Sequence, residues 1–188
     1  MMGTTLHPGK NALSSIQTPP HAHVHAARGV VHAASFRDPS GFIFLDEHEL
    51  LRQINTRYHG DYRKLIDTGL YDELTGEGLL IEHEEVSLDR RVTSDAAFVI
   101  RPEAMPFISY PYEWTFGMLR DAALLQLELV EAAISEDMTL KDATPYNIQF
   151  MSGRPVFIDI PSFETLQPGT PWAGYRQFCE LFLFPLML

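Results

Sequence analysis

Residues 140–147 read Leu-Lys-Asp-Ala-Thr-Pro-Tyr-Asn, and the interpretation of the whole chain starts from this stretch. An apolar run follows at residues 148–150, then a Ser-Gly-Arg turn at 152–154 and a Val-Phe-Ile run at 156–158 that ends on Asp159. Two apolar runs on either side of a tight turn with glycine are typical of a β-hairpin. The stretch therefore predicts a polar loop followed by a hairpin.

Three polar side chains in this region are the candidate functional residues: Asp142, Asn147 and Asp159. An Asp and an Asn on one loop, with a second Asp just beyond a hairpin, can converge on one point. Phosphotransferases need such convergence, because one Asp orients a hydroxyl group while the Asn and the other Asp hold Mg²⁺ on nucleotide phosphates. A structural turn is the alternative, since Asp caps turns and Asn tolerates left-handed backbone. That alternative explains Asp159 less well, because Asp is rare in strands.

A long helix is predicted just before the loop. Apolar residues recur at helical spacing from residue 113 to residue 134, and no proline interrupts them. Because the apolar face is wide, we expect this helix to be buried on most sides. Apolar residues resume helical spacing after residue 171.

The region 28–112 predicts an α+β lobe of short strands and two helices. Asp-Pro-Ser-Gly at 38–41 is a strong turn signal and predicts a hairpin between the apolar runs around it. Asp46 and Glu49 have the spacing of a capping box, which predicts a helix over residues 46–60. A second helix is predicted at 61–74, weakened by Gly69 and Gly76. Short strands are predicted at 79–81, 97–100 and 107–110. The acidic cluster of Glu82, Glu84 and Glu85 is predicted to lie on a solvated edge or loop.

Residues 1–27 are predicted to form a flexible arm, because they are rich in Gly, Pro, Ser, Thr and His and lack periodicity. Three of their histidines, His21, His23 and His25, alternate, so on a strand they would share a face and could bind Zn²⁺ or Ni²⁺ adventitiously. A solvated tail is the favoured interpretation.

The bulk composition excludes several classes of partner. A net charge of −11 argues against a nucleic-acid surface and against docking on anionic membranes. The single cysteine, Cys179, allows no internal disulfide, and the N-terminus lacks the pattern of a signal peptide, so we expect a cytoplasmic protein. The strongly apolar residues 181–188 predict that the chain is the front part of a longer polypeptide.

The loop, the hairpin and Asp159 together resemble the catalytic loop and metal-binding Asp of the protein-kinase-like fold, most closely its small-molecule branch, the aminoglycoside and choline kinases. The resemblance implies a two-lobe architecture in which residues 113–188 form a helical lobe that is incomplete at its C-terminus. It also implies that Asp142 positions a substrate hydroxyl group, and that Asn147 and Asp159 hold Mg²⁺ with ATP.

The sequence departs from that family at the phosphate-binding residues. Leu140 stands where the kinase loop usually carries His, and none of the lysines lies on a predicted strand of the first lobe. Arg101 is the nearest substitute, but its planar fork does not act as a compact point charge. Gly76 and Gly78 lack the third glycine of a phosphate-binding loop. These departures predict a kinase-like domain that is degenerate.

Several motifs also resemble a group of bacterial proteins described as class I S-adenosylmethionine-dependent methyltransferases, some of them related to nodulation proteins. The motifs are Ser-Tyr-Pro-Tyr-Glu-Trp at 109–114, the loop at 140–150, residues 155–159 with Ser162-Phe163, and Pro171-Trp172 with residues 175–178. In that group the methyltransferase domain lies downstream of a region like residues 29–188. No strand, Gly-rich turn and helix for this cofactor occurs in the present sequence.

This second resemblance implies a region that serves substrate recognition or assembly, with a downstream methyltransferase domain of the same polypeptide as its partner and as the place of the S-adenosylmethionine site. Its substrate would be a small molecule or a glycan. Methyl transfer by the longer chain is favoured over phosphoryl transfer. Two alternatives stay open, namely an active Mg²⁺–ATP-dependent small-molecule phosphotransferase and an interaction module without chemistry.

Overall fold

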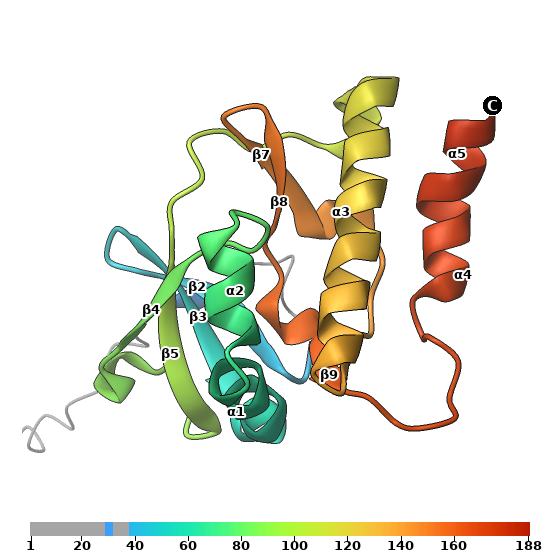
Figure 1. Ribbon diagram of the computed structural model, residues 1–188. Helices are drawn as coiled ribbons and strands as arrows, with labels where there is room; N and C mark the ends of the chain where they lie inside the picture. The colour runs from blue at the N-terminus through green and yellow to red at the C-terminus, as the bar shows by residue number, and fades with distance from the viewer. Residues whose placement is uncertain (1–28, 32–37) are drawn as a thin grey trace, which may run out of the picture.

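The computed structural model describes residues 29–31 and 38–188. A five-stranded antiparallel sheet with two helices is followed by a long helix, two small sheets and a C-terminal helical segment (Figure 1). The expected α+β class is confirmed. The predicted arm with its three histidines, and most of the first predicted strand, lie outside the described residues.

The large sheet has the strand order β1-β2-β3-β5-β4, and all neighbouring strands are antiparallel. The strands are β1 (Val30–Val31), β2 (Gly41–Asp46), β3 (Glu49–Asn55), β4 (His83–Val86) and β5 (Ala96–Pro102). A side chain at Gly41 would collide with the backbone carbonyl oxygen of Gln53, so glycine lets β2 approach β3 closely. The predicted hairpin turn at 38–41 connects β1 to β2, and the acidic cluster lies on and beside the edge strand β4.

The prediction of a helix over residues 46–60 is wrong for most of its length, because residues 46–55 form the β2–β3 turn and strand β3, and the α-helix begins only at His59. Asp46 and Glu49 are the last register pair of the hairpin, and Glu47 takes a positive φ of 56° in the turn between them. Strand β3 is paired by β2 on one side and by β5 on the other. Because this pairing satisfies the backbone groups of β3, it outweighs the local capping-box signal.

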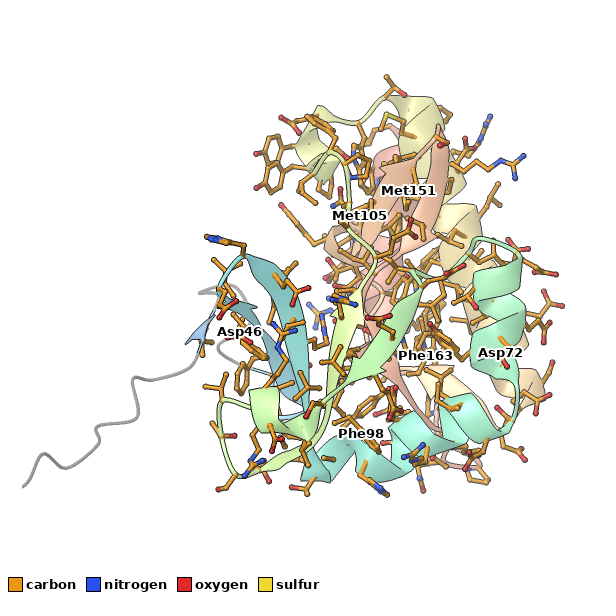
Figure 2. The ribbon with its side chains drawn as sticks, turned by 90° about the vertical axis from the view of Figure 1, so that its left-hand side faces the viewer. Asp46, Asp72, Phe98, Met105, Met151 and Phe163 are labelled. Carbon is orange, nitrogen blue, oxygen red and sulfur yellow. The ribbon has the colours of Figure 1, made fainter. Side chains whose placement is uncertain are left out.

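Helices α1 (His59–Asp67) and α2 (Leu70–Gly76) connect β3 to β4 and cover one face of the sheet (Figure 2). Gly69, with a φ of 84°, separates the two helices where the sequence predicted an interruption. Asp61 on α1 accepts hydrogen bonds through Oδ1 from Thr165 N (2.9 Å) and Thr165 Oγ1 (2.7 Å). Tyr58 donates its hydroxyl to the carbonyl oxygen of Ile160 at 2.7 Å. The start of α1 is therefore tied to residues 160–165, the part of the chain that follows the hairpin predicted after residue 147.

A partly buried histidine, His83, lies at the start of β4 and faces α1. His83 Nε2 is 2.9 Å from the hydroxyl of Tyr62, which in turn donates to Glu85 Oε1 at 3.1 Å. No side chain among the described residues pairs with the buried Nδ1 of His83. Burial, together with the smaller effect of the positive charge of Arg52, lowers the pKa of His83 to about 4. The folded chain therefore keeps this imidazole neutral.

Acidification is expected to destabilise the protein through His83. The pKa of histidine in an unfolded chain is about 6.5, so between about pH 6.5 and 4 the unfolded state binds more protons than the folded state. Stability therefore falls as the pH is lowered through this window, by about 2 kcal/mol between pH 7 and pH 5. Urea unfolding at the two pH values measures the loss. The same difference in a His83→Gln variant isolates the histidine from the carboxylates, and an equal loss in both proteins would contradict the assignment.

The connection from β5 to the long helix is not a strand, so the prediction of a strand at 107–110 is wrong. The side chain of Gln149 accepts a hydrogen bond from Ser109 N at 2.9 Å and donates one to Ser109 O at 3.0 Å. Trp114 Nε1 donates to Ser109 Oγ at 2.9 Å. Side chains thus satisfy the backbone here, and no neighbouring strand is needed.

Helix α3 (Phe116–Ser135) confirms the predicted long helix, and Thr115 caps it by accepting a hydrogen bond from Met118 N at 3.3 Å. One face is buried, as predicted. The expectation of burial on most sides is wrong, however, because Leu124, Leu127 and Ile134 on α3 are all exposed. Within the described residues no helix is long and apolar enough to cross a membrane.

Two small antiparallel sheets follow α3: β6 with β9, and the predicted hairpin of β7 with β8. Their strands are β6 (Met138–Leu140), β7 (Ile148–Met151), β8 (Arg154–Phe157) and β9 (Phe163–Thr165). The chain then forms one helical segment made of α4 (Tyr175–Phe178), a π-helical stretch (Cys179–Leu183) and α5 (Phe184–Met187). The main hydrophobic core joins all these elements, since it includes Ile54 of β3, Leu129 of α3, Phe163 of β9 and Phe182.

Candidate functional site

The candidate site lies where strand β3 faces the loops around the β7–β8 hairpin. Asp159 follows β8 directly, and its Oδ1 forms an ion pair with Arg52 Nη1 of β3 at 2.9 Å. The side chain of Arg52 is only 12% exposed, and that of Asp159 only 18%. Ion pairs that are this well shielded from water interact far more strongly than surface pairs. The ion pair therefore fixes the predicted Asp159 against the sheet.

Ser162 joins Asp159 to Asn147. The fully buried Ser162 hydroxyl donates to Asp159 Oδ2 at 2.7 Å, and Asn147 Nδ2 donates to Ser162 Oγ at 3.2 Å. Asn147 ends a short 3-10 turn (Pro145–Asn147), and its carbonyl oxygen accepts from Ile158 N at 2.8 Å. The loop and the end of the hairpin are thus brought together, as the sequence predicted.

Asp142 is half-buried in the loop after β6. Burial raises the pKa of its carboxyl group, the neighbouring Lys141 lowers it, and the negative charges of Asp159 and Asp38 raise it again. Lys141 Nζ reaches toward the sheet, where it lies 3.6 Å from Asp38 Oδ1 and 3.1 Å from Ser40 Oγ. Asp142 therefore lies close enough to Asp159 for their charges to interact, and both positive and negative side chains surround it.

The donor set around Asp159 bears on the predicted Mg²⁺. This ion prefers octahedral oxygen coordination from one or two carboxylates, water and substrate phosphates. Among residues 29–31 and 38–188 no group of three or more His, Cys, Asp and Glu side chains could hold a metal ion. Arg52 and Ser162 each engage one oxygen of Asp159, so a metal ion there would share the carboxylate with a guanidinium group, and the two positive charges would repel each other. The roles of Asn147 and Asp159 as metal ligands, and of Asp142 as the hydroxyl-positioning residue, stay predictions.

Arg52 is the site residue that sequence reasoning missed, because the predicted helix hid its strand. The run Leu50-Leu51-Arg52-Gln53-Ile54 on β3 could have been read as a strand flanked by a tight turn. Arg101, the predicted substitute for the strand lysine, instead forms ion pairs with Glu49 and Glu84 on the sheet surface. Ser162 belongs to one of the sequence motifs described above, but no local pattern indicates that it bridges Asp159 and Asn147.

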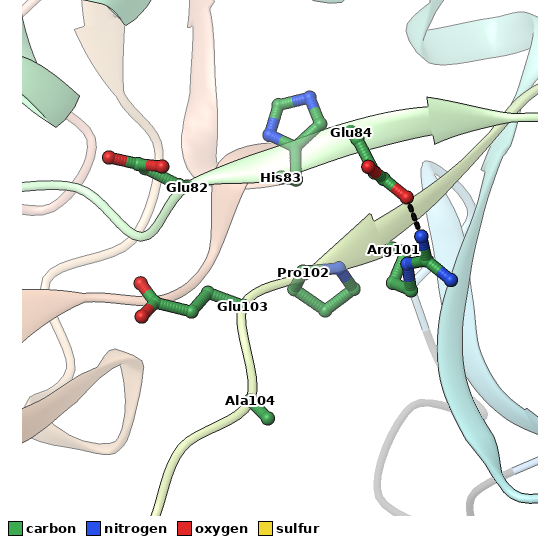
Figure 3. A pocket seen from close by; sticks show the side chains of 7 residues that line it. All are labelled: Glu82, His83, Glu84, Arg101, Pro102, Glu103 and Ala104. Atoms are coloured by element: carbon green, nitrogen blue, oxygen red, sulfur yellow. Dashed lines mark hydrogen bonds and ion pairs between the residues drawn. The ribbon is translucent and has the colours of Figure 1, made fainter.

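A separate open pocket of about 370 Å³ lies beside the ends of β4 and β5 (Figure 3). Its lining residues are Glu82, His83, Glu84, Arg101, Pro102, Glu103 and Ala104. None of the three predicted site residues lines it. The candidate site is therefore the cluster around Asp159, and this pocket is distinct from it.

Comparison with known proteins gives one informative similarity. No protein-family profile matches the chain. The chain is 37% identical over 158 residues to the nodulation protein NoeA of Rhizobium meliloti (strain 1021). This alignment covers 83% of the chain, which spans about a third (33%) of the length of that protein.

Proposed function

We propose that the chain is a kinase-like region that no longer transfers phosphoryl groups and that serves substrate recognition or assembly in a bacterial S-adenosylmethionine-dependent methyltransferase. The observation that carries the proposal is the shielded ion pair between Arg52 and Asp159. Asp142 keeps a binding role here and accepts a hydrogen bond from a hydroxyl group of a small-molecule or glycan ligand. We expect neither nucleic acid nor a membrane as partner, because the net charge is −11.

The arrangement around Asp159 supports the kinase-like part. In protein kinases a cation on the third strand of the sheet faces the phosphates, while an Asn of the catalytic loop and an Asp beyond it hold the metal ions. Here β3 carries Arg52, the loop carries Asn147, and Asp159 follows the hairpin. The strand order β1-β2-β3-β5-β4, with α1 and α2 between β3 and β4, places that cation opposite the loop.

The same ion pair supports the loss of phosphoryl transfer. An arginine side chain stays charged at every pH a protein meets, and its planar fork differs from the compact ammonium group of a lysine. A Mg²⁺ ion on Asp159 would lie close to the guanidinium group of Arg52, and repulsion between the two cations would weaken or separate the ion pair. Separating a shielded ion pair is costly, because each charge then needs a new partner. The bound metal and phosphates would have to supply that energy.

The methyltransferase part rests on the motifs at 109–114, 140–150 and 171–178. The similarity to NoeA is compatible with this part of the proposal. NoeA is about three times as long as the aligned segment, so that protein has room for a further domain. We propose that the partner of this region is such a domain on the same polypeptide, and that S-adenosylmethionine binds there. Titration calorimetry of the 188-residue chain with S-adenosylmethionine should then detect no binding, and tight binding would overturn this part.

Titration with Mg²⁺ and ATP separates the degenerate region from an active phosphotransferase. We expect millimolar Mg²⁺–ATP to leave the melting temperature of the chain unchanged. A live site filled at a hundred times its Kd would raise the free energy of unfolding by about 2.7 kcal/mol. For a chain of this size that corresponds to roughly 5–10 °C in melting temperature. A shift of that size, abolished in an Asp159→Ala variant, would support the phosphotransferase instead.

The phosphotransferase remains the second candidate because Asn147 and Asp159 are joined through Ser162 and Asp142 lies within electrostatic reach of them. A non-catalytic interaction module would give no response to any small ligand. The two titrations therefore distinguish a phosphotransferase from the other candidates, and ligand screens against an Asp142→Asn variant distinguish recognition from pure assembly.

A further inference from the structure

We propose that the helical segment at the C-terminus positions Asp142, and that Gln177 of α4 and Gln126 of α3 are the positioning residues. Both glutamines hold the same peptide unit, the one between Asp142 and Ala143. Gln126 Nε2 donates to the carbonyl oxygen of Asp142 at 3.4 Å, and Ala143 N donates to Gln177 Oε1 at 2.7 Å. We call these two contacts the glutamine clamp. The inference rests on the proposed function in one respect, namely that Asp142 binds a ligand.

The start of α4 is seated closely on the loop. Trp172 Nε1 donates a hydrogen bond to the carbonyl oxygen of Leu140 at 2.7 Å. Leu140 is the last residue of β6, so this bond lies at the start of the loop. A Cβ atom at Gly174 would lie 3.0 Å from the Cβ of Ala143 and 2.9 Å from the indole of Trp172. Only glycine allows this approach without displacement. The loop therefore takes its place from a segment some thirty residues further along the chain.

The hydrogen bonding of Gln126 indicates that this residue positions the loop. Its side chain is fully buried, yet its Oε1 has no hydrogen-bond partner among the described residues. A buried polar atom without a partner destabilises a fold, and an apolar residue of the same shape would avoid that cost. What the amide adds is its contact with the Asp142 carbonyl oxygen. This pattern is expected of a residue that orders the loop.

The ionisation of Asp142 reports whether the clamp holds. Its carboxyl group is surrounded by Lys141 of its own loop, Asp159 after β8, Asp38 before β2 and Glu164 of β9. Burial is the largest cause that raises the pKa of Asp142. If the clamp is released, the carboxyl group gains water, and its pKa falls toward the value of about 3.9 for an exposed aspartate.

The test is a carbon-13 NMR titration of the Asp142 carboxyl group, with hydrogen exchange of the Ala143 amide, in the 188-residue chain without ligand. In Gln177→Met we expect the pKa of Asp142 to fall and the Ala143 amide to exchange faster. Gln177→Glu keeps an acceptor for that amide, so protection and a raised pKa should persist. Arg176→Gln is the matched control, because Arg176 is exposed and, among the described residues, its side chain pairs with Glu180 of the same helical segment and not with the loop.

An unchanged Asp142 pKa and unchanged Ala143 exchange in Gln177→Met would overturn the proposal. Should that variant not fold, Gln126→Met decides by the same two readouts, and its stability should not fall below that of the parent. The titration uses no ligand. A failed clamp is therefore distinguishable from a failed proposal of function, which the nucleotide and ligand titrations test.

Discussion

Replacement of Arg52 by methionine is expected to lower the free energy of unfolding by about 3–5 kcal/mol, the range for breaking a buried ion pair by removing one partner. The pair joins Arg52 Nη1 to Asp159 Oδ1 at 2.9 Å, and both side chains are largely shielded from water. Without Arg52, the carboxylate of Asp159 keeps one hydrogen bond from Ser162 and, within the part of the chain that the structure describes, no other ion-pair partner. Urea unfolding at pH 7 measures the loss.

Arg101→Met is the matched control for that substitution. Arg101 lies on the neighbouring strand β5 and pairs with Glu49 and Glu84, but its side chain is 42% exposed. Exposed ion pairs contribute about 0–1 kcal/mol, so this variant should stay close to the parent. Arg52→Lys should lie between the two, because it keeps the charge and loses the fork. Equal losses in the Arg52 and Arg101 methionine variants would contradict the role given to the Arg52 pair.

Replacement of Gln149 by leucine is expected to lower the free energy of unfolding by about 2–6 kcal/mol, because two buried backbone groups lose their partners at about 1–3 kcal/mol each. The amide of Gln149 pairs with both N and O of Ser109, and both residues are buried. The same urea titration measures the effect. Gln167→Leu, at an exposed glutamine in the loop after β9, is the control and should change stability by less than about 0.5 kcal/mol. A loss for Gln149→Leu no larger than that of the control would show that Ser109 finds other partners.

The parts of the fold that the sequence predicted have strong local signals. The Ser-Gly pair between two apolar runs predicts the β7–β8 hairpin, and twenty residues of helical periodicity predict α3. The interruption at Gly69 follows from the ability of glycine to take a positive φ. In each case the signal and the structure involve the same few neighbouring residues.

The parts that were missed depend on distant partners. Strands β6 and β9 have three residues each, and only their mutual pairing makes them strands. Residues 46–55 carry a capping-box spacing by coincidence, and the pairing of β3 with β5, some forty-five residues away, decides their conformation. Because Arg52 lies in that segment, the error in secondary structure also removed the main cation from the predicted site. The hydrogen-bond partners of Asp142 and Asn147, namely Gln126 and Ser162, are likewise set by tertiary packing.

The continuous core has a consequence for how the molecule responds to its environment. The same buried cluster contains Ile54 of the large sheet, Leu129 of α3 and Phe182 near the C-terminus. Hydrogen bonds from Tyr58 to Ile160 and from Thr165 to Asp61 cross the same junction. Neither the sheet nor α3 can therefore melt alone, because each would expose apolar surface that the other covers. Heat and denaturant should therefore unfold the described residues as a single cooperative unit.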